Sequence, residues 1–428
     1  MKTFYKVLLG ILFLCITSIS TAQTTKEEVF DNIKQTGGVY FAYPSDKIKP
    51  ETPSPKGYKP FYISHFSRHG SRYLISDSEY KDVLDLLVKA EQEKALTPLG
   101  KETLHRLQKV WEEVEHRGGD LSPLGVREHK GIAERMYQSY PEVFEKDASI
   151  YACATTVMRC ALSMDAFCER LKELNPNLQT HRDASMFHQR YLNHHTKEAV
   201  AWRSAPDTWR IEYNKFEQEH IKPNRLVQSI FSDDTFVLRK VNPKDFMWGM
   251  YWIASGMQNI ETETSFYDLF EKQELFDIWQ CHNYQRYACD ANYALNNGLM
   301  FENNKPMLRN ILDEAEKAIN SNKRGANLRF AHDGNLVPMA LLLHLEGCYE
   351  SIENPYDFYK VWSDFKVTPM AGNIQLVFYK SRDKNEPILV KFLLHENEVL
   401  VPPIKTNNAP YYEWNDVKEF YEDLLLSK

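Results

Sequence analysis

The stretch 67–73 (SRHGSRY) brings together side chains that could do chemistry. Arg68, His69 and Arg72 lie within five consecutive positions, with Gly70 between them. Arginine pairs bind planar oxyanions through bidentate hydrogen bonds, glycine lets a loop pass close to a ligand, and a neutral imidazole can attack an electrophile. These are the parts of a phosphate-handling site. A solvated basic loop is the alternative, so partners elsewhere in the chain must decide between the two.

A third arginine stands at the start of a predicted helix. Residues 149–154 (SIYACA) have the β-branched and aromatic content of a strand, and Thr155 and Thr156 are placed to cap the helix that follows. Arg159 then lies in the first helical turn, where the helix dipole disfavours a cation. An anion bound at the same helix end would account for this arginine, whereas an exposed arginine would need no account.

A second imidazole follows a third predicted strand, at 327–331 (NLRFA). His332 and Asp333 come directly after it and lead into a predicted helix at 336–345. Aspartate often caps a helix, so the pair alone is weak support for a site. Next to a bound phosphate, however, an aspartate could act as a general acid and base.

Three predicted strands, at 61–66, 149–154 and 327–331, must position these groups, and each runs into a loop that enters a helix. Parallel strands present their carboxyl ends at one edge of a sheet. His69 could then attack phosphorus to give a phosphohistidine, while Asp333 protonates the leaving oxygen and later deprotonates water. The scheme requires no metal or other cofactor. The groups expected to hold the phosphate are Arg68, Arg72, Arg159 and His332.

This combination resembles the histidine acid phosphatase branch of the histidine phosphatase superfamily. The resemblance rests on the Arg-His-Gly-x-Arg loop at 68–72, on Arg159 and on His332-Asp333, in the family's order, and 121–125 (LSPLG) is also similar to a family stretch. It implies an α/β core with a mostly parallel central sheet flanked by helices, as in phosphoglycerate mutase, and an inserted α-helical cap. The roles that it implies are His69 as nucleophile, Asp333 as proton donor, and Arg68, Arg72, Arg159 and His332 as phosphate ligands.

The substrate class stays open at this point. Members acting on inositol hexakisphosphate often continue the first loop with Pro-Thr, whereas this chain has Leu74-Ile75. The stretch 156–160 (TVMRC) looks like the multiple inositol polyphosphate phosphatases, which usually carry His-Ala-Glu where this chain has His-Asp-Gly at 332–334. We therefore expect a small-molecule phosphomonoester, either an inositol polyphosphate such as phytate or a sugar phosphate.

Composition and the N-terminus bound the remaining possibilities. Residues 1–22 have the basic start, short apolar run and small-residue end of a secretory signal, which predicts an exported protein, periplasmic or secreted, with no membrane span after cleavage. Losing the two lysines of this segment takes the formal charge from −7 to −9, which does not favour nucleic acid as a partner. We expect an α/β core at 23–182 and 323–428 and a helical cap insertion at 183–322, where aromatic residues and helical periodicity dominate.

The cysteines match no metal or redox motif. In an exported chain they permit disulfides, and Cys281 with Cys289 is the best-placed local pair. A metal site could be proposed from the cluster His181, Asp183, His188, His194 and His195, but no metal-binding helix motif is present.

A protein of another class is the stronger alternative to an enzyme. Trp202, Trp209, Trp248, Trp252 and Trp279 could belong to an exported glycan-binding protein or an inactive phosphatase-like binding protein, although core packing is the commoner role of tryptophan. A mutase of the same superfamily is disfavoured, because its usual substrates are cytosolic.

Overall fold

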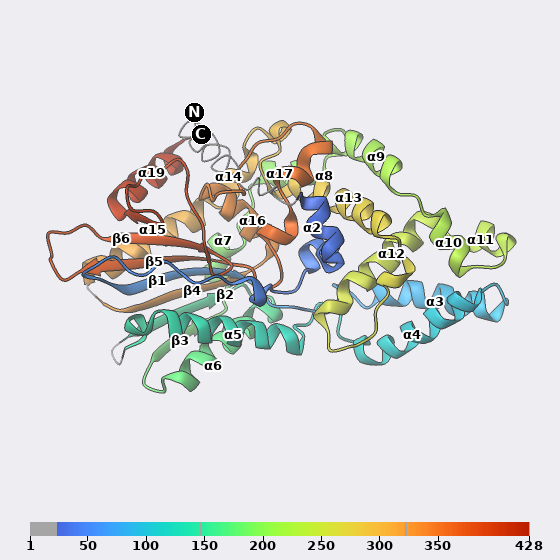
Figure 1. Ribbon diagram of the computed structural model, residues 1–428, viewed down its shortest axis with the longest axis horizontal. Coiled ribbons are helices and arrows are strands. Elements are labelled where there is room, and N and C mark those ends of the chain that lie inside the picture. Colours follow the sequence, from blue (N-terminus) through green and yellow to red (C-terminus); the bar gives the residue numbers. More distant parts are fainter. Residues whose placement is uncertain (1–23, 146–147, 322, 428) are drawn as a thin grey trace, which may run out of the picture.

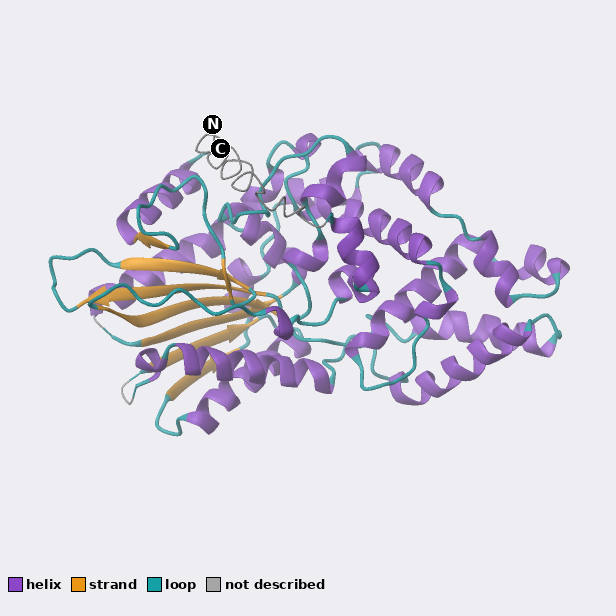
Figure 2. Ribbon diagram, viewed as in Figure 1, coloured by secondary structure: helices purple, strands orange, loops and turns teal. Residues whose placement is uncertain are grey.

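A central eight-stranded sheet organises the residues that this computed structural model describes, 24–145, 148–321 and 323–427 (Figures 1 and 2). The predicted signal sequence, residues 1–22, lies outside the described residues. The strand order is β3-β2-β4-β1-β5-β6-β7, and β8 pairs with β6. The strands are β1 (Tyr58–Arg68), β2 (Ser149–Ala154), β3 (Gln179–Asp183), β4 (Gly325–Ala331), β5 (Asn373–Ser381), β6 (Leu389–Leu394), β7 (Asn397–Glu398) and β8 (Tyr411–Glu413).

The sheet is mixed, with a parallel half and an antiparallel half. Strand β2 pairs in parallel with β3 and β4, and β4 pairs in parallel with β1. Strands β5 and β6 form the predicted hairpin and join β1 antiparallel. The three predicted site-bearing strands are thus confirmed as β1, β2 and β4, which are adjacent and parallel. Their carboxyl ends share one edge of the sheet.

Helices cover both faces of the sheet, which explains why most side chains of β1 and β4 are buried on both sides (Figure 1). On one face, α5 (Pro123–Ser139) and α6 (Met158–Leu174) pack over β2 and β4. On the other lie α15 (Lys305–Ser321), α16 (Asp333–Leu342) and α19 (Trp414–Leu426). Helix α15 buries Met307, Leu308, Ile311 and Leu312. These apolar residues recur in the sequence at the spacing of one helix face.

A helical region extends from the site end of the sheet, on the right of Figure 1. Helices α3 and α4, which precede the predicted insertion, pack there against α12 and α10. Conversely, α7 (Met186–Leu192) and α15 belong to the predicted insertion but contact strands of the sheet. The helical character of 183–322 is therefore confirmed, while the domain boundaries stay a prediction. The helices of this region are α3 (Ser78–Gln92), α4 (Pro98–Val114), α9 (Trp209–His220), α10 (Asn224–Ile230), α11 (Asp234–Lys240), α12 (Pro243–Gly256) and α13 (Lys272–Asp290).

Helix-start chemistry explains two of the boundaries and fails at a third. Thr97 and Ser122 cap α4 and α5 by accepting hydrogen bonds from the amides of Gly100 and Gly125, as predicted. Helix α6 instead begins after Val157 with no side-chain cap, so the predicted capping by Thr155 or Thr156 is wrong. The remaining helices are α2 (Thr25–Asp31), α7 (Met186–Leu192), α8 (Lys197–Ser204), α14 (Leu299–Asn303), α17 (Phe358–Val361) and α18 (Asp364–Val367).

Two further expectations can be compared with the structure. The Cys281–Cys289 disulfide is not formed, and every cysteine of the described residues has a free thiol. Both residues lie on α13, and eight residues of helix separate them by about 12 Å, too far for a disulfide. None of the five tryptophans considered for glycan binding is exposed, in line with core packing. No helix within the described residues is long and apolar enough to cross a membrane.

Candidate active site

The three predicted segments meet at the carboxyl edge of the parallel strands. The amide of His69, just past β1, donates to the carbonyl oxygen of Ala331 at the end of β4 (3.0 Å). On the other side of β4, the amide of Thr155 donates to the carbonyl oxygen of Phe330 (3.0 Å). The chain then enters α6, whose first turn carries Arg159. Strand register thus brings together all six residues singled out from the sequence.

Close backbone packing supports the loop 68–72. A Cβ atom on Gly70 would lie 2.5 Å from the carbonyl oxygen of Gly125, and one on Gly125 would lie 2.3 Å from that of Ser71. The two segments touch because neither glycine has a side chain. The amide and hydroxyl of Ser122 also donate to the carbonyl oxygen of Ser71, at 2.9 and 3.0 Å. The segment 121–125 therefore acts as a platform for the loop.

Glu128, on α5, holds the same loop from the side. Its Oε2 accepts a hydrogen bond from the amide of Ser71 (2.7 Å), and its Oε1 accepts from the Ser71 hydroxyl (2.8 Å) and the Tyr43 amide (3.0 Å). Burial raises the pKa of Glu128, although these hydrogen bonds oppose the shift. The loop 68–72 is therefore anchored at several points.

Arg68 is fully buried and anchored on one side only. Its Nη1 donates to the carbonyl oxygens of Val39 (2.5 Å) and Thr368 (2.8 Å), while its Nε and Nη2 have no hydrogen-bond partner among the described residues. Burial lowers the pKa of Arg68 to about 10, so the guanidinium stays charged at neutral pH. Buried donors normally find acceptors, and two on one guanidinium suit an oxyanion.

Arg72 and Arg159 extend the cationic surface. The Nη1 of Arg72 donates to the hydroxyl of Tyr40 (3.1 Å), and its guanidinium lies 4.8 Å from the centre of that ring. The Nη1 of Arg159 donates to the carbonyl oxygen of Gly119 (3.3 Å). Burial and then the charge of Arg72 lower the pKa of Arg159, because two cations lie near one another. Bound between them, an anion would relieve that repulsion.

His69 is held as a neutral imidazole with one nitrogen available. Its Nδ1 lies 2.9 Å from the carbonyl oxygen of Gly70, an acceptor, so Nδ1 carries the hydrogen and Nε2 keeps its lone pair. Burial, followed by the charges of Arg68, Arg72 and Arg159, holds the pKa of His69 well below its usual range. At neutral pH this arrangement is that of a nucleophile.

His332 faces His69 across the site, with ring centres 5.8 Å apart. Its Nε2 lies 3.1 Å from the hydroxyl of Thr155, and the Cys160 sulfur lies 3.7 Å from both of its ring nitrogens. Thr155, predicted to cap α6, therefore orients this ring instead. Burial lowers the pKa of His332 to about 4 although the adjacent Asp333 opposes the shift, so the ring is neutral at pH 7.

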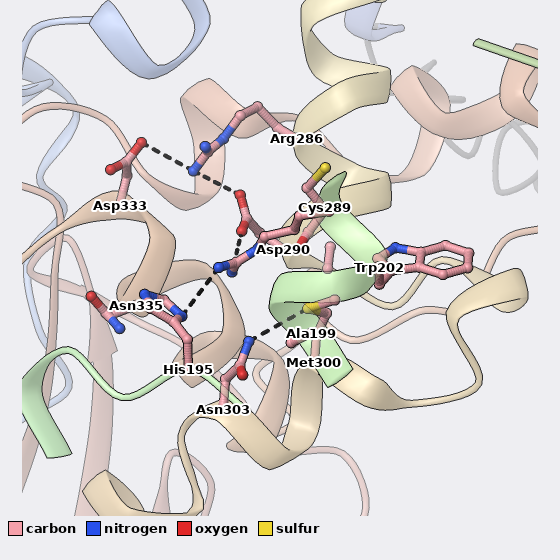
Figure 3. Close-up of polar contacts among 12 residues, drawn as sticks. His195, Ala199, Trp202, Arg286, Cys289, Asp290, Met300, Asn303, Asp333 and Asn335 are labelled. Atoms are coloured by element: carbon pink, nitrogen blue, oxygen red, sulfur yellow. Dashed lines mark hydrogen bonds and ion pairs between the residues drawn. The ribbon is translucent and has the colours of Figure 1, made fainter. Parts of the chain in front are cut away.

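Asp333 begins α16 and pairs with an arginine from another helix. Its Oδ2 lies 3.0 Å from Nη2 of Arg286 on α13, and the same nitrogen lies 2.9 Å from Oδ2 of Asp290 (Figure 3). Burial acts to raise the pKa of Asp333, but the charges of Arg286 and Arg68 outweigh it and hold the pKa well below its usual range. The sequence did not indicate Arg286, because no local motif marks it.

A pocket of about 440 Å³ opens beside Asp333 and is lined also by His332 and Gly334. Its basic side chains come from α8, α9 and α13 and from the chain before α8. Three arginines line it against two carboxylates, so this wall favours an anionic group. The charged and titratable residues of the wall are His195, Arg203, Arg210, His282, Arg286 and Asp290.

The histidines considered for a metal have other contacts. His181 stacks on Tyr151, with ring centres 4.8 Å apart, and Nε2 of His188 lies 2.8 Å from Asp183. Nδ1 of His195 lies 3.1 Å from Arg203. Within the described ranges, no group of three or more His, Cys, Asp or Glu side chains could hold a metal ion.

Comparison with known proteins agrees with this geometry. Residues 64–395 match the histidine phosphatase superfamily (branch 2). The fold is similar to that of the multiple inositol polyphosphate phosphatase of Bifidobacterium longum in complex with inositol hexasulfate (TM-score 0.78, 18% identity, 90% of this chain and 97% of that chain). It is also similar to the phytase from D. castellii (TM-score 0.66, 14% identity, 97% of this chain and 90% of that chain).

At these identities the structural neighbours show the fold alone. None of the curated proteins matches the sequence significantly. The family match spans most of the chain and includes the first loop, the start of α6 and the His332-Asp333 pair. The chain therefore belongs to branch 2 of the histidine phosphatase superfamily and is a phosphatase of phosphate monoesters.

Proposed function

We propose that this phosphatase works through a phosphohistidine on His69, with Asp333 as the proton donor. One observation carries the proposal: Nδ1 of His69 is engaged by the Gly70 carbonyl, which leaves Nε2 free next to arginine donors that have no partner within the described residues. A neutral nucleophile and an oxyanion cradle are the two requirements of a phosphoryl transfer that proceeds through the enzyme.

In the first step, Nε2 of His69 forms a bond to phosphorus as the bond from phosphorus to the leaving oxygen breaks. The carboxyl proton of Asp333 passes to that oxygen, which leaves as an alcohol. The ring then carries a positive charge, which the Gly70 carbonyl stabilises through Nδ1–H. Arg68, Arg72 and Arg159 balance the charge on the phosphoryl oxygens.

In the second step, the carboxylate of Asp333 takes a proton from water as the water oxygen attacks phosphorus. The bond between phosphorus and Nε2 breaks, inorganic phosphate leaves, and both residues return to their starting forms. Splitting the displacement in this way lets one residue act first as acid and then as base. No metal or cofactor takes part in the scheme.

The substrate that we propose is an inositol polyphosphate such as phytate, with sugar phosphates as the alternative. The arginine-lined pocket beside Asp333 lies where the leaving group must be, and arginines bind phosphate groups bidentately. A neutral sugar would gain little from that wall. Release of phosphate from phytate, inositol monophosphates and glucose 6-phosphate would rank these classes, and equal rates for all three would remove the preference.

We further propose that the protein is exported, on the basis of the signal-like residues 1–22. Fractionation of cells that express the full chain should place phosphatase activity outside the cytoplasm, and deletion of residues 2–22 should retain it inside. Activity that stays cytoplasmic with the full chain would overturn this part.

The test of the mechanism is His69→Ala with p-nitrophenyl phosphate. We expect a loss of about 10⁴-fold or more in kcat, because the variant lacks the nitrogen that attacks phosphorus. His105→Ala, at an exposed position on α4, is the matched control and should keep wild-type activity. Rapid acid or alkaline quenching with ³²P-labelled substrate should trap label on wild-type protein and none on His69→Ala. Equal turnover by both proteins would refute the mechanism.

A further inference from the structure

Arg286 sits between two carboxylates, one of which is the proposed proton donor (Figure 3). Its Nη2 lies 3.0 Å from Oδ2 of Asp333 and 2.9 Å from Oδ2 of Asp290. Neither its Nε nor its Nη2 makes a hydrogen bond of good geometry in the described residues. Charge therefore holds Arg286 in place more than directed hydrogen bonding does, and such a contact can be exchanged when another anion arrives.

Asp290, in contrast, is firmly held. Its side chain is 3% exposed, and its Oδ1 accepts a hydrogen bond from Nη2 of Arg203 (2.7 Å). Arg203 also donates through Nε to the carbonyl oxygen of Cys289 (3.0 Å), and its Nη1 lies 3.1 Å from Nδ1 of His195. Of the two acids beside Arg286, Asp333 is the one that also interacts with Arg68 and Arg72 of the first loop.

This arrangement conflicts with the first chemical step. Asp333 must hold a proton to release an alcohol, but Arg286 favours its ionised form. Something must weaken the Arg286–Asp333 contact when substrate binds. The charged and titratable groups that face this pair are Asp290, His282 and Cys289 on α13, Arg203 on α8, Arg210 on α9, Asp364 on α18, Arg159 and Cys160 on α6, His195, Arg68, His69, Arg72 and His332. Arg286 is the one in contact with Asp333 that also lines the leaving-group pocket.

We propose that Arg286 is a positioning residue that couples the leaving group to the proton donor: a second anionic group in the pocket draws the guanidinium away from Asp333. Asp333 then takes up a proton from solvent, and the substrate promotes the release of its own leaving oxygen. A substrate whose leaving group is uncharged leaves the ion pair intact. The inference rests on the proposed function and adds a specificity rule, namely that anionic leaving groups are released faster for a reason beyond tighter binding.

The test compares two alkyl phosphates with one scissile ester each, butyl phosphate and 3-phosphonopropyl phosphate. Alcohol release is measured in single turnover with enzyme in excess, so that the pH profile reports protonation of the bound complex in the first step. We expect the rate to fall as pH rises for both, with the fall about one pH unit higher for the phosphonate substrate. At a pH above both midpoints this is about a tenfold difference in relative rate. Coincident profiles would overturn the inference in wild-type protein, without any variant.

Substitutions at Arg286 and at Asp290 should shift the pH profile of alcohol release in opposite directions. Arg286→Gln removes the cation, so the profile for butyl phosphate should move upward to near that of the phosphonate substrate. Arg286→Lys keeps a cation and should largely retain the wild-type profile. Asp290→Asn leaves Arg286 to Asp333 alone, and the butyl phosphate profile should move downward. A profile that Arg286→Gln does not move would also overturn the inference, because a structural role alone predicts changed stability and an unchanged midpoint.

Arg309→Gln is the matched control, since Arg309 pairs with Glu422 on the surface between α15 and α19. It should leave both profiles unchanged. Failure of the proposed function looks different from failure of the inference: the first would show as turnover that survives His69→Ala, the second as normal His69-dependent turnover with profiles that do not depend on the leaving group.

Discussion

The side of the site that carries His69 and the side that carries Asp333 are held by different forces. Arg68 and the loop after it are fixed by main-chain carbonyls, main-chain amides and two glycines in contact. Asp333 is instead held by an ion pair with a side chain from a distant helix, and that arginine is shared with Asp290 (Figure 3). Main-chain contacts shift only if the sheet edge shifts, whereas ion pairs exchange partners when a new charge arrives. The comparison suggests a rigid phosphate cradle beside an adjustable leaving-group end.

Removal of Arg68 should have the largest effect on catalysis, and the effect should not depend on the leaving group. Arg68→Met is expected to lower kcat/KM by about 10³- to 10⁵-fold for every monoester, because two buried donors to the phosphoryl oxygens are lost. Steady-state kinetics with p-nitrophenyl phosphate and butyl phosphate would measure this, with Arg309→Met as control. A loss in kcat/KM that differs greatly between the two substrates would contradict the difference between the His69 side and the Asp333 side of the site.

Removal of the proton donor should be selective. Asp333→Asn is expected to slow butyl phosphate by about 10²- to 10⁴-fold but p-nitrophenyl phosphate far less, because nitrophenolate leaves without a proton. In wild-type protein, release from alkyl phosphates should also fall as pH rises, since Arg286 holds the pKa of Asp333 low and only the protonated form acts. Equal losses for both substrates would assign Asp333 a binding role instead.

The rigidity of the cradle should appear in stability. In Gly125→Ala the new Cβ would lie 2.3 Å from the Ser71 carbonyl oxygen, so the backbone must move, and we expect a loss of about 1–3 kcal/mol in the free energy of unfolding. A Cβ on Gly334, on the donor side, would meet nothing within 4 Å, and Gly334→Ala should be neutral or slightly stabilising. Urea unfolding would measure both. Similar costs at the two positions would contradict the difference in packing.

The smallest expected effect is that of His129 on the pH dependence of stability. Burial lowers the pKa of His129 to about 3, although the main chain of Arg68 opposes the shift. Its unfolded form, with a pKa near roughly 6.5, binds a proton that the folded form does not, so His129 lowers stability as pH falls from about 6.5 toward 3. His129→Leu should reduce that slope by at most about 1.4 kcal/mol per pH unit. Denaturation midpoints between pH 7 and pH 4 would show it, and an unchanged slope would indicate that His129 is not buried as a neutral ring.

Much of the fold followed from local patterns. Strands β1, β2 and β4 and the starts of α4 and α5 agree with runs of apolar residues and with Thr or Ser before Pro. These signals are readable because backbone propensity and capping act over a few residues. The prediction that Thr155 caps α6 was wrong because a distant residue decides its contact: the Thr155 hydroxyl lies within hydrogen-bond distance of His332. The Cys281–Cys289 pairing failed because a continuous helix separates the two thiols.

The residues proposed to handle a phosphate were singled out from the chain alone, because Arg68, His69, Arg72, Arg159, His332 and Asp333 each follow a recognisable strand or open a helix. How those residues are held could be seen only in the folded molecule. The free nitrogen of His69, the carbonyls on Arg68 and the Glu128 anchor depend on how separate segments pack. The Arg286–Asp333 pair depends on the position of α13 against α16. Contacts of that kind join residues far apart in the chain, and no local propensity encodes them.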